Sequence, residues 1–382
     1  MSAPPDLQSS PTGATRPHEA LALSRTAAIP GSSIPTAESG AAATRARRGG
    51  AGRGMAPRPG VQSEGGDRRT LIVLGLLALG VVAMSIAYLT LGVRGGWAYV
   101  LPRRATTVAT LLLVATAIGV ATVLFHTITD NHILTPSVMG LDSLYLLIQT
   151  VAVYAIGSAG VTQLPEVTQF VAALTLMTGL SYALYRRLLL GLGHDLHLLV
   201  LVGIVLGVLM RSLTNFFTRV MDPTEFLVLQ DRMFADFTGA PLPTLGMSAL
   251  VCVPVLALLA REHRTLDVMA LGRDTAIGLG VEHRRVLLRV LVQVVLLVAV
   301  ATALVGPTMF FGLIAAHLAY RAVGTYRHRY TLPAAALVGS LVLVGGQTLL
   351  ERVLRADTNL AVVVEFVGGL LFIALLLRRS TP

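Results

Sequence analysis

Residues 286–305 read VLLRVLVQVVLLVAVATALV, a run of twenty residues in which Arg289 is the single charged side chain. As a helix, such a run is about 30 Å long, which matches the hydrocarbon thickness of a bilayer. Backbone groups in lipid must pair within their own segment, so an apolar run of this length is expected to be an α-helix. The segment therefore predicts a transmembrane helix, and its neighbours repeat the pattern.

Nine further apolar runs flank this segment, and short polar stretches separate them. Hydrophobic residues make up 54% of the 382 residues and charged residues 13%, whereas soluble domains carry about 25% charge. We therefore expect an all-α integral membrane protein with about ten transmembrane helices. The predicted spans are Leu71–Leu91, Ala105–Phe125, Leu141–Ile156, Val167–Tyr185, Leu196–Phe217, Leu245–Ala260, Val286–Val305, Thr308–Val323, Ala334–Leu354 and Leu360–Leu377.

Residues 1–67 differ from this pattern, because they are rich in Ala, Gly, Pro, Ser and Arg. They cannot bury enough apolar surface to offset the entropy of ordering, so we expect a disordered tail before a ten-helix transmembrane domain at residues 68–379. The tail lacks the apolar core of a secretory signal. Two interpretations stay open. The tail is a basic arm near anionic lipid headgroups, or it has no role, either as an unstructured extension or because translation truly starts near Met55.

The composition excludes several kinds of site. All 30 basic residues are arginine, which excludes a Walker A lysine and a Schiff-base lysine. Cys252 is the single cysteine, so the chain forms no intrachain disulfide and no multi-cysteine metal site. The net charge of +10 is typical of nucleic-acid binding as well, but these arginines lie between apolar spans. Membrane topology explains them better, and no nucleic-acid partner is expected.

The placement of arginines predicts the orientation in the membrane. With the N-terminus inside, the predicted inner loops and C-terminal end contain thirteen arginines and the predicted outer side eight. Because cytoplasmic loops carry the excess of basic residues, we expect both termini in the cytoplasm and a multi-pass protein of the plasma membrane. The outer arginines still need an explanation; they are Arg94, Arg103, Arg104, Arg211, Arg219, Arg232, Arg352 and Arg355.

Two motifs flank the span quoted first. Residues 266–281 read LDVMALGRDTAIGLGV, residues 306–313 read GPTMFFGL, and residues 316–319 read AHLA. Together they resemble the FecCD-type permeases, the membrane subunits of ABC importers for ferric siderophores, haem and cobalamin. That family's pattern is ALG-x-x-x-A-x-x-LGV, GP-x-x-F-x-GL and PH-x-x-R, with proline where this chain has Ala316. The likeness runs from about residue 70 to 379 and implies the type II ABC importer permease architecture.

The first half resembles one branch of that family. Residues 101–103, LPR, are similar to the family's RLPR, with Val100 in place of the first arginine. Residues 125–145, FHTITDNHILTPSVMGLDSLY, resemble permeases for catecholate-type ferric siderophores such as anguibactin, vibriobactin and petrobactin. The resemblance implies a ferric siderophore as substrate and a second, different permease subunit as partner. A homodimer remains an alternative to this heterodimer.

The loop between the sixth and seventh predicted spans, about residues 262–285, contains a short amphipathic segment, whose apolar residues can form a stripe on a short helix: Leu266, Ala270, Leu271, Ala276 and Leu279. Leu271-Gly272 breaks the apolar run and Gly280 is suited to end a helix. The residues alone also fit an interfacial helix in the lipid headgroups. The resemblance implies a coupling helix that docks on an ABC ATPase, which acts as a dimer. The residues assigned to it are Leu266, Ala270, Leu271, Gly272, Arg273, Asp274, Ala276, Leu279 and Gly280.

Polar or broken positions inside the spans are candidates for a transport pathway. Gly306-Pro307 interrupts the helical pattern, and it either lines a pathway or forms a tight turn at the outer surface. Glu365 lies inside the tenth span, where a carboxylate costs about 2.5–3.5 kcal/mol on insertion. It either takes part in gating or makes a structural hydrogen bond, and Gln347 and Glu351 leave the same alternatives. The pathway and gating candidates are Gly306, Pro307, Phe310 and Glu365.

Within the resemblance, some outer arginines meet glutamates on the two lobes of an extracytoplasmic siderophore-binding protein. Arg103 matches the family's LPR position directly, whereas Arg104, Arg352 and Arg355 match by region. Arginine suits this docking because its planar fork holds a carboxylate with two hydrogen bonds. The alternative is that these side chains snorkel to the outer lipid headgroups.

The remaining expectations concern cofactors and energy. His126, His132, His194 and His317 lack metal-ligand spacing in the sequence, so we expect no metal site and no cofactor. The chain has no phosphate-binding loop and is expected to be a transport subunit rather than an enzyme. It would move a ferric siderophore by alternating access, driven by the separate ATPase. Cobalamin or haem import is the alternative within this class. An ion-coupled secondary transporter, which needs paired intramembrane carboxylates and inverted repeats, is the alternative outside it.

Overall fold

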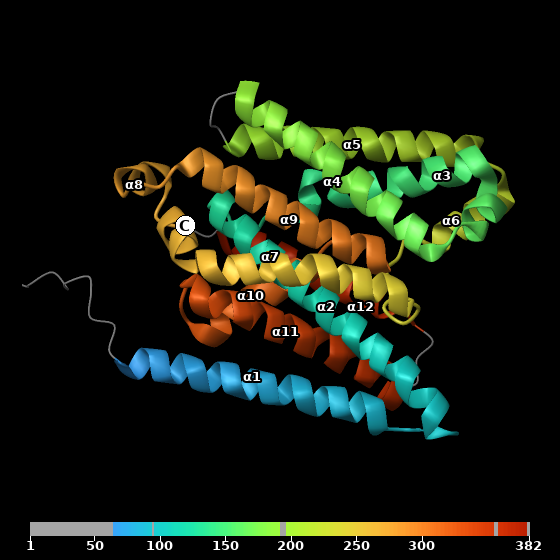
Figure 1. The fold of residues 1–382 in the computed structure, drawn as a ribbon, viewed down its shortest axis with the longest axis horizontal. Helices are drawn as coiled ribbons and strands as arrows, with labels where there is room; N and C mark the ends of the chain where they lie inside the picture. The colour runs from blue at the N-terminus through green and yellow to red at the C-terminus, as the bar shows by residue number, and fades with distance from the viewer. Residues whose placement is uncertain (1–63, 94, 192–195, 355–357, 380–382) are drawn as a thin grey trace, which may run out of the picture. The chain divides into compact units, whose positions relative to one another are not determined.

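A computed structural model describes residues 64–93, 95–191, 196–354 and 358–379. These residues form helices joined by short loops, and they contain no β-strand (Figure 1). The α-helices are α1 (Glu64–Thr90), α2 (Trp97–Thr129), α3 (Leu141–Gln163), α4 (Glu166–Gly191), α5 (Leu196–Val220), α6 (Pro223–Asp231), α7 (Leu242–Met269), α8 (Arg273–Gly278), α9 (His283–Val305), α10 (Phe311–Val323), α11 (His328–Thr348) and α12 (Leu360–Arg379). A 3-10 helix, η1 (Pro136–Met139), leads into α3, and a π-helix, η2 (Leu349–Leu354), extends α11.

Eight helices in the described part are long and apolar enough to cross a bilayer. They are α1 to α5, α7, α9, and α11 together with η2. The shorter apolar helices α10 and α12 correspond to the two remaining predicted spans. The prediction of an all-α membrane protein is confirmed, and each predicted span coincides with one of these helices.

The helix boundaries differ from the predicted ones where the sequence gives no hydropathy signal. Helix α2 begins at Trp97, so Arg103 and Arg104 lie inside its first turns rather than before it. Helix α6 is short and was not predicted. Helix α3 contains a break at Gly157, whose φ of 73° is in the left-handed region that favours glycine.

The core of the bundle is built around α2, which packs against α9, α10 and α11. Small residues allow this close approach: a Cβ atom placed on Gly119 of α2 would lie 2.9 Å from the carbonyl oxygen of Ala335 in α11. A Cβ on Gly339 would likewise lie 3.2 Å from the carbonyl oxygen of Ala115. Glycine contacts of this kind let membrane helices gain van der Waals packing, since lipid supplies no hydrophobic drive between them.

The helix ends gather at two opposite ends of the bundle. Figure 1 shows α8 at the same end as the start of α1, while α6 and the α1–α2 connection lie at the other end. We call these the α8 end, which contains Arg273–Gly278, and the α6 end, which contains Pro223–Asp231.

Candidate functional site

The predicted coupling segment forms two separate pieces at the α8 end. Helix α7 continues to Met269, the chain turns at Gly272 with a φ of 91°, and α8 covers Arg273–Gly278. Gly280, with a φ of 84°, ends α8. Its N–H donates to Ile277 O at 2.9 Å and the next N–H, of Val281, donates to Ala276 O at 3.0 Å, which is the hydrogen-bond pattern of a Schellman cap. The predicted glycine break and glycine stop are therefore where the sequence placed them.

The apolar stripe predicted for this segment is divided between two environments. Leu266 belongs to α7 and is buried, and Ala276 anchors α8 with no exposed surface. Leu271 and Leu279 point outward and are 60% and 61% exposed. Ile277, which was not among the predicted residues, is 50% exposed beside them. The prediction of one stripe along a single helix is wrong, because the turn at Gly272 separates α7 from α8 and leaves some of its members buried and others exposed.

Polar contacts fix the base of this segment to the rest of the bundle. The Asp267 carboxylate near the end of α7 accepts hydrogen bonds from the backbone N–H and the ring Nδ1 of His328, each at 2.7 Å. The His328 Nε2 atom lies 2.7 Å from the Thr127 hydroxyl of α2. Glu262 of α7 pairs with Arg289 of α9 at 2.5 Å. These contacts join the end of α7, which precedes α8, to α9 and α11, and they join α11 to α2.

The Gly306-Pro307 break is buried inside the protein. Gly306 ends α9 with a φ of 103°, and α10 starts only at Phe311. A Cβ on Gly306 would lie 3.2 Å from the carbonyl oxygen of Phe234, and together with the positive φ this close approach favours glycine here. The N–H of Asp236 donates to the carbonyl of Val305 at 2.8 Å. Broken backbone at this depth is tolerated because surrounding protein satisfies its polar groups.

Helix α12 lies directly on this break. Gly368 faces Phe310 so closely that a Cβ would collide with the Phe310 side chain. The Phe310 and Phe372 ring centroids are 5.9 Å apart. Glu365 is partly buried, and its carboxylate lies beside the backbone N–H of Met309. This contact joins α12 to the turn before α10, and both predicted roles of Glu365, gating and a structural hydrogen bond, stay open.

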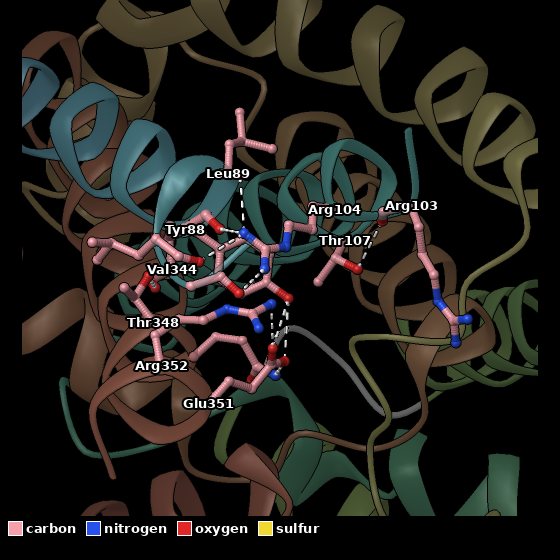
Figure 2. A network of polar contacts seen from close by, with 12 residues as sticks. Tyr88, Leu89, Arg103, Arg104, Thr107, Val344, Thr348, Glu351 and Arg352 are labelled. Carbon is pink, nitrogen blue, oxygen red and sulfur yellow. Dashed lines mark hydrogen bonds and ion pairs between the residues drawn. The ribbon is translucent and has the colours of Figure 1, made fainter. Parts of the chain in front are cut away.

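The outer arginines have different environments at the α6 end. Arg103 is exposed, and Figure 2 shows it directed away from the other labelled side chains. Arg104 is 7% exposed, and its guanidinium donates to the carbonyls of Tyr88, Leu89, Leu91 and Gly92 at 2.9 to 3.3 Å. The assignment of Arg104 to docking conflicts with this position, since the side chain caps the last turn of α1. Arg355 lies outside the described residues.

Arg352 belongs to a polar network centred on Glu351 in η2 (Figure 2). An Arg352 guanidinium nitrogen lies 2.9 Å from the Glu351 carboxylate, and its Cζ atom lies 5.0 Å from the Tyr88 ring centroid. The Tyr88 hydroxyl donates to both Glu351 oxygens, at 3.1 and 3.2 Å. Gln347 also donates to Glu351. Sequence spacing gave no sign of this link between α1 and η2, because the partners are 263 residues apart.

The structure also gathers histidines that are far apart in the sequence. The His126 ring centroid lies 5.5 Å from that of His132 and 6.0 Å from that of His317. The His126 and His132 rings border a cavity of about 1020 Å³, which is also lined by Asp67, Arg327 and Leu271. Among the described residues, no group of histidine, cysteine or acidic side chains has the arrangement of a metal site. His194 lies outside the described residues.

The comparison with known proteins decides which transporter class this arrangement belongs to. The model of the FecCD transport family matches residues 70–378. The chain belongs to the FecCD transport family. The resemblance seen in the motifs at residues 266–281 and 306–313 is thereby confirmed.

Individual members of the FecCD family show how far the likeness extends. The petrobactin import system permease protein YclO of Bacillus subtilis (strain 168) is 40% identical over 286 residues, which cover 75% of this chain and 91% of that protein. The petrobactin import system permease protein FatC of Bacillus anthracis is 33% identical over 280 residues, which cover 73% and 79%. A solved inward-facing structure of a metal-chelate type ABC transporter matches with a TM-score of 0.70 at 20% identity, over 80% of this chain and 99% of that one. FecCD permeases are transport subunits of ABC importers, so this chain is a multi-pass membrane permease that works with an ATPase and a substrate-binding protein.

Proposed function

We propose that this permease imports a ferric siderophore of the catecholate type, with petrobactin as the first candidate. The observation that carries the proposal is the similarity to YclO, which extends over 91% of that petrobactin permease. FatC, also a petrobactin permease, is the second strong relative. The residue 125–145 segment, which resembles this branch, supports the same substrate class.

The energy for transport comes from a separate ATPase dimer at the α8 end. The chain contains no lysine, so it lacks the residue with which a Walker A loop holds nucleotide phosphates. Leu271, Ile277 and Leu279 supply an exposed apolar surface on a rigidly capped segment, as required for seating in a groove of a soluble partner. The contacts of Asp267 with His328 and of Glu262 with Arg289 then carry the movement of this segment to the membrane helices.

The orientation follows from the same assignment. If the ATPase binds at the α8 end, that end faces the cytoplasm, and both chain termini lie in the cytoplasm. The α6 end then faces outward and receives the siderophore-binding protein, for which Arg103 offers an exposed guanidinium. A second permease subunit, in a heterodimer or a homodimer, completes the pathway. Closure of the ATPase dimer alternates access between the two sides.

Cobalamin and haem import are the alternatives within the family, and an ion-coupled transporter is the alternative outside it. A strain lacking this gene separates siderophore import from haem import when growth is measured with ferric petrobactin, haemin or ferric citrate as the sole iron source. The proposal predicts that growth on ferric petrobactin alone is lost and that the chain restores it. Loss of growth on haemin with normal growth on ferric petrobactin would contradict the proposal.

A further inference from the structure

We propose that Glu351 masks Arg352 from acidic partners, so that docking at the α6 end replaces one carboxylate by another. The inference rests on the proposed docking of a binding protein at this end. It assigns the outer arginines unequal roles: Arg103 is available at once, Arg352 becomes available by exchange, and Arg104 is never available.

The ion pair between Arg352 and Glu351 has the geometry of an exchangeable contact. The two charged groups lie 2.9 Å apart, and their side chains are 21% and 28% exposed. They are therefore shielded from bulk water but reachable by a group that approaches along the α6 end. Because both side chains keep part of their surface exposed, solvent still screens the ion pair and weakens it. An incoming carboxylate therefore has one weakened ion pair to replace.

Arg352 can leave Glu351 without leaving that carboxylate unpaired. Tyr88 donates to both Glu351 oxygens, at 3.1 and 3.2 Å, and Gln347 donates to the same group. A buried acceptor that keeps its other donors avoids most of the desolvation penalty of a lost hydrogen bond. Arg352 also has a hydrogen-bond donor to spare, because its Nε atom is buried and has no hydrogen-bond partner.

Arg104, at the same end of the bundle, is an arginine whose partners cannot be exchanged. Its guanidinium already donates to four backbone carbonyls of the α1 end, at 2.9 to 3.3 Å. Arg352 has one carboxylate and the face of the Tyr88 ring instead. Both residues of the pair lie in a π-helix, a conformation that is frequent at functional sites. These differences identify Arg352, rather than Arg104, as the arginine whose carboxylate partner can be replaced.

The test measures the dissociation constant of the cognate binding protein for the reconstituted importer. Glu351→Gln keeps the side-chain length and removes the competing charge, so it should tighten binding about three- to five-fold, as expected for release of one modest ion pair. Glu351→Asp keeps the charge, draws the carboxylate back from Arg352, and should tighten binding by a smaller factor. If Glu351→Gln does not assemble in the membrane, the dissociation constant measured with Glu351→Asp tests the proposal instead.

Two controls separate unmasking from a general change of charge. Asp222→Asn removes the same charge from the N-cap of α6, where asparagine can still accept the hydrogen bond that Thr224 N–H donates at 2.9 Å. It should leave the dissociation constant unchanged. In the Arg352→Gln background, Glu351→Gln should no longer tighten binding.

The outcomes distinguish this inference from the proposed function on which it rests. Arg103→Glu should weaken binding whether or not Glu351 masks Arg352. If Arg103→Glu weakens binding but neither Glu351 variant tightens it, masking is overturned and docking stands. If Asp222→Asn tightens binding as much as Glu351→Gln, the effect is long-range charge and masking is again overturned. If neither Arg103→Glu nor Arg352→Gln alters binding, the docking proposal fails and masking fails with it.

Discussion

Replacement of Arg104 by alanine should destabilise the permease, although the sequence suggested a docking role for this residue. The side chain is 7% exposed and donates to four carbonyls at the end of α1. A hydrogen bond to a charged group contributes about 1.5–3 kcal/mol. Because the carbonyls near the end of the helix can bond water instead, the free energy of unfolding should fall by about 3 kcal/mol, which is less than the sum over the four hydrogen bonds. At roughly 2 °C per kcal/mol for a chain of this size, the apparent Tm falls by about 6 °C.

The assay is thermal unfolding of the detergent-solubilised permease, with Arg103→Ala as the matched control. Arg103 is the neighbouring residue on the same helix turn and is exposed, so its replacement should alter the apparent Tm by less than about 1 °C. Arg104→Lys should be intermediate, since an ammonium is a point charge and cannot reach all four carbonyls as the planar guanidinium does. Equal Tm values for Arg103→Ala and Arg104→Ala would refute the capping role of Arg104.

Three further substitutions test other parts of the account. Gly119→Val should prevent stable insertion or lower the apparent Tm by well over 5 °C, since its Cβ would lie 2.9 Å from Ala335 O; an unchanged unfolding curve would show that α2 and α11 are not packed this closely. Leu271→Glu with Leu279→Glu should abolish co-purification of the ATPase and siderophore uptake while the permease stays in the membrane, whereas alanine at both positions should reduce uptake only in part; wild-type uptake by the double glutamate variant would remove α8 from the docking surface. Glu365→Leu should lose about 1–3 kcal/mol because the Met309 N–H is left unpaired, while Glu365→Gln should lose less; a large loss of transport by Glu365→Gln at normal stability would show that the charge itself takes part in gating.

Hydropathy and short motifs were sufficient to predict most of the membrane architecture. Apolar runs such as Val286–Val305 specify spanning helices because lipid leaves the backbone no other way to pair its polar groups. Glycines 272 and 280 were predicted to break and end the coupling segment, and both have positive φ angles that favour glycine. Local backbone chemistry of this kind is encoded within a few residues and can be read without a structure.

The sequence could not predict contacts made across the bundle. Arg103 and Arg104 are adjacent and of the same type, yet one is exposed and the other is buried under the end of α1. Their difference depends on which face of α2 meets α1, and no periodicity marks that face because α2 is apolar almost all round. Glu351 lies 263 residues from its partner Tyr88, and the histidine rings of His126 and His317 meet only after α2 and α10 have packed.

The most direct test of the proposed function is uptake of ⁵⁵Fe-labelled ferric petrobactin into proteoliposomes that contain the whole importer. The vesicles would hold this permease, its partner permease and the ATPase, with binding protein outside and ATP inside. The account predicts uptake that requires both ATP and binding protein and that excess unlabelled cobalamin or haemin does not reduce. Uptake that continues without ATP, or that is suppressed by cobalamin or haemin but not by unlabelled ferric petrobactin, would contradict it.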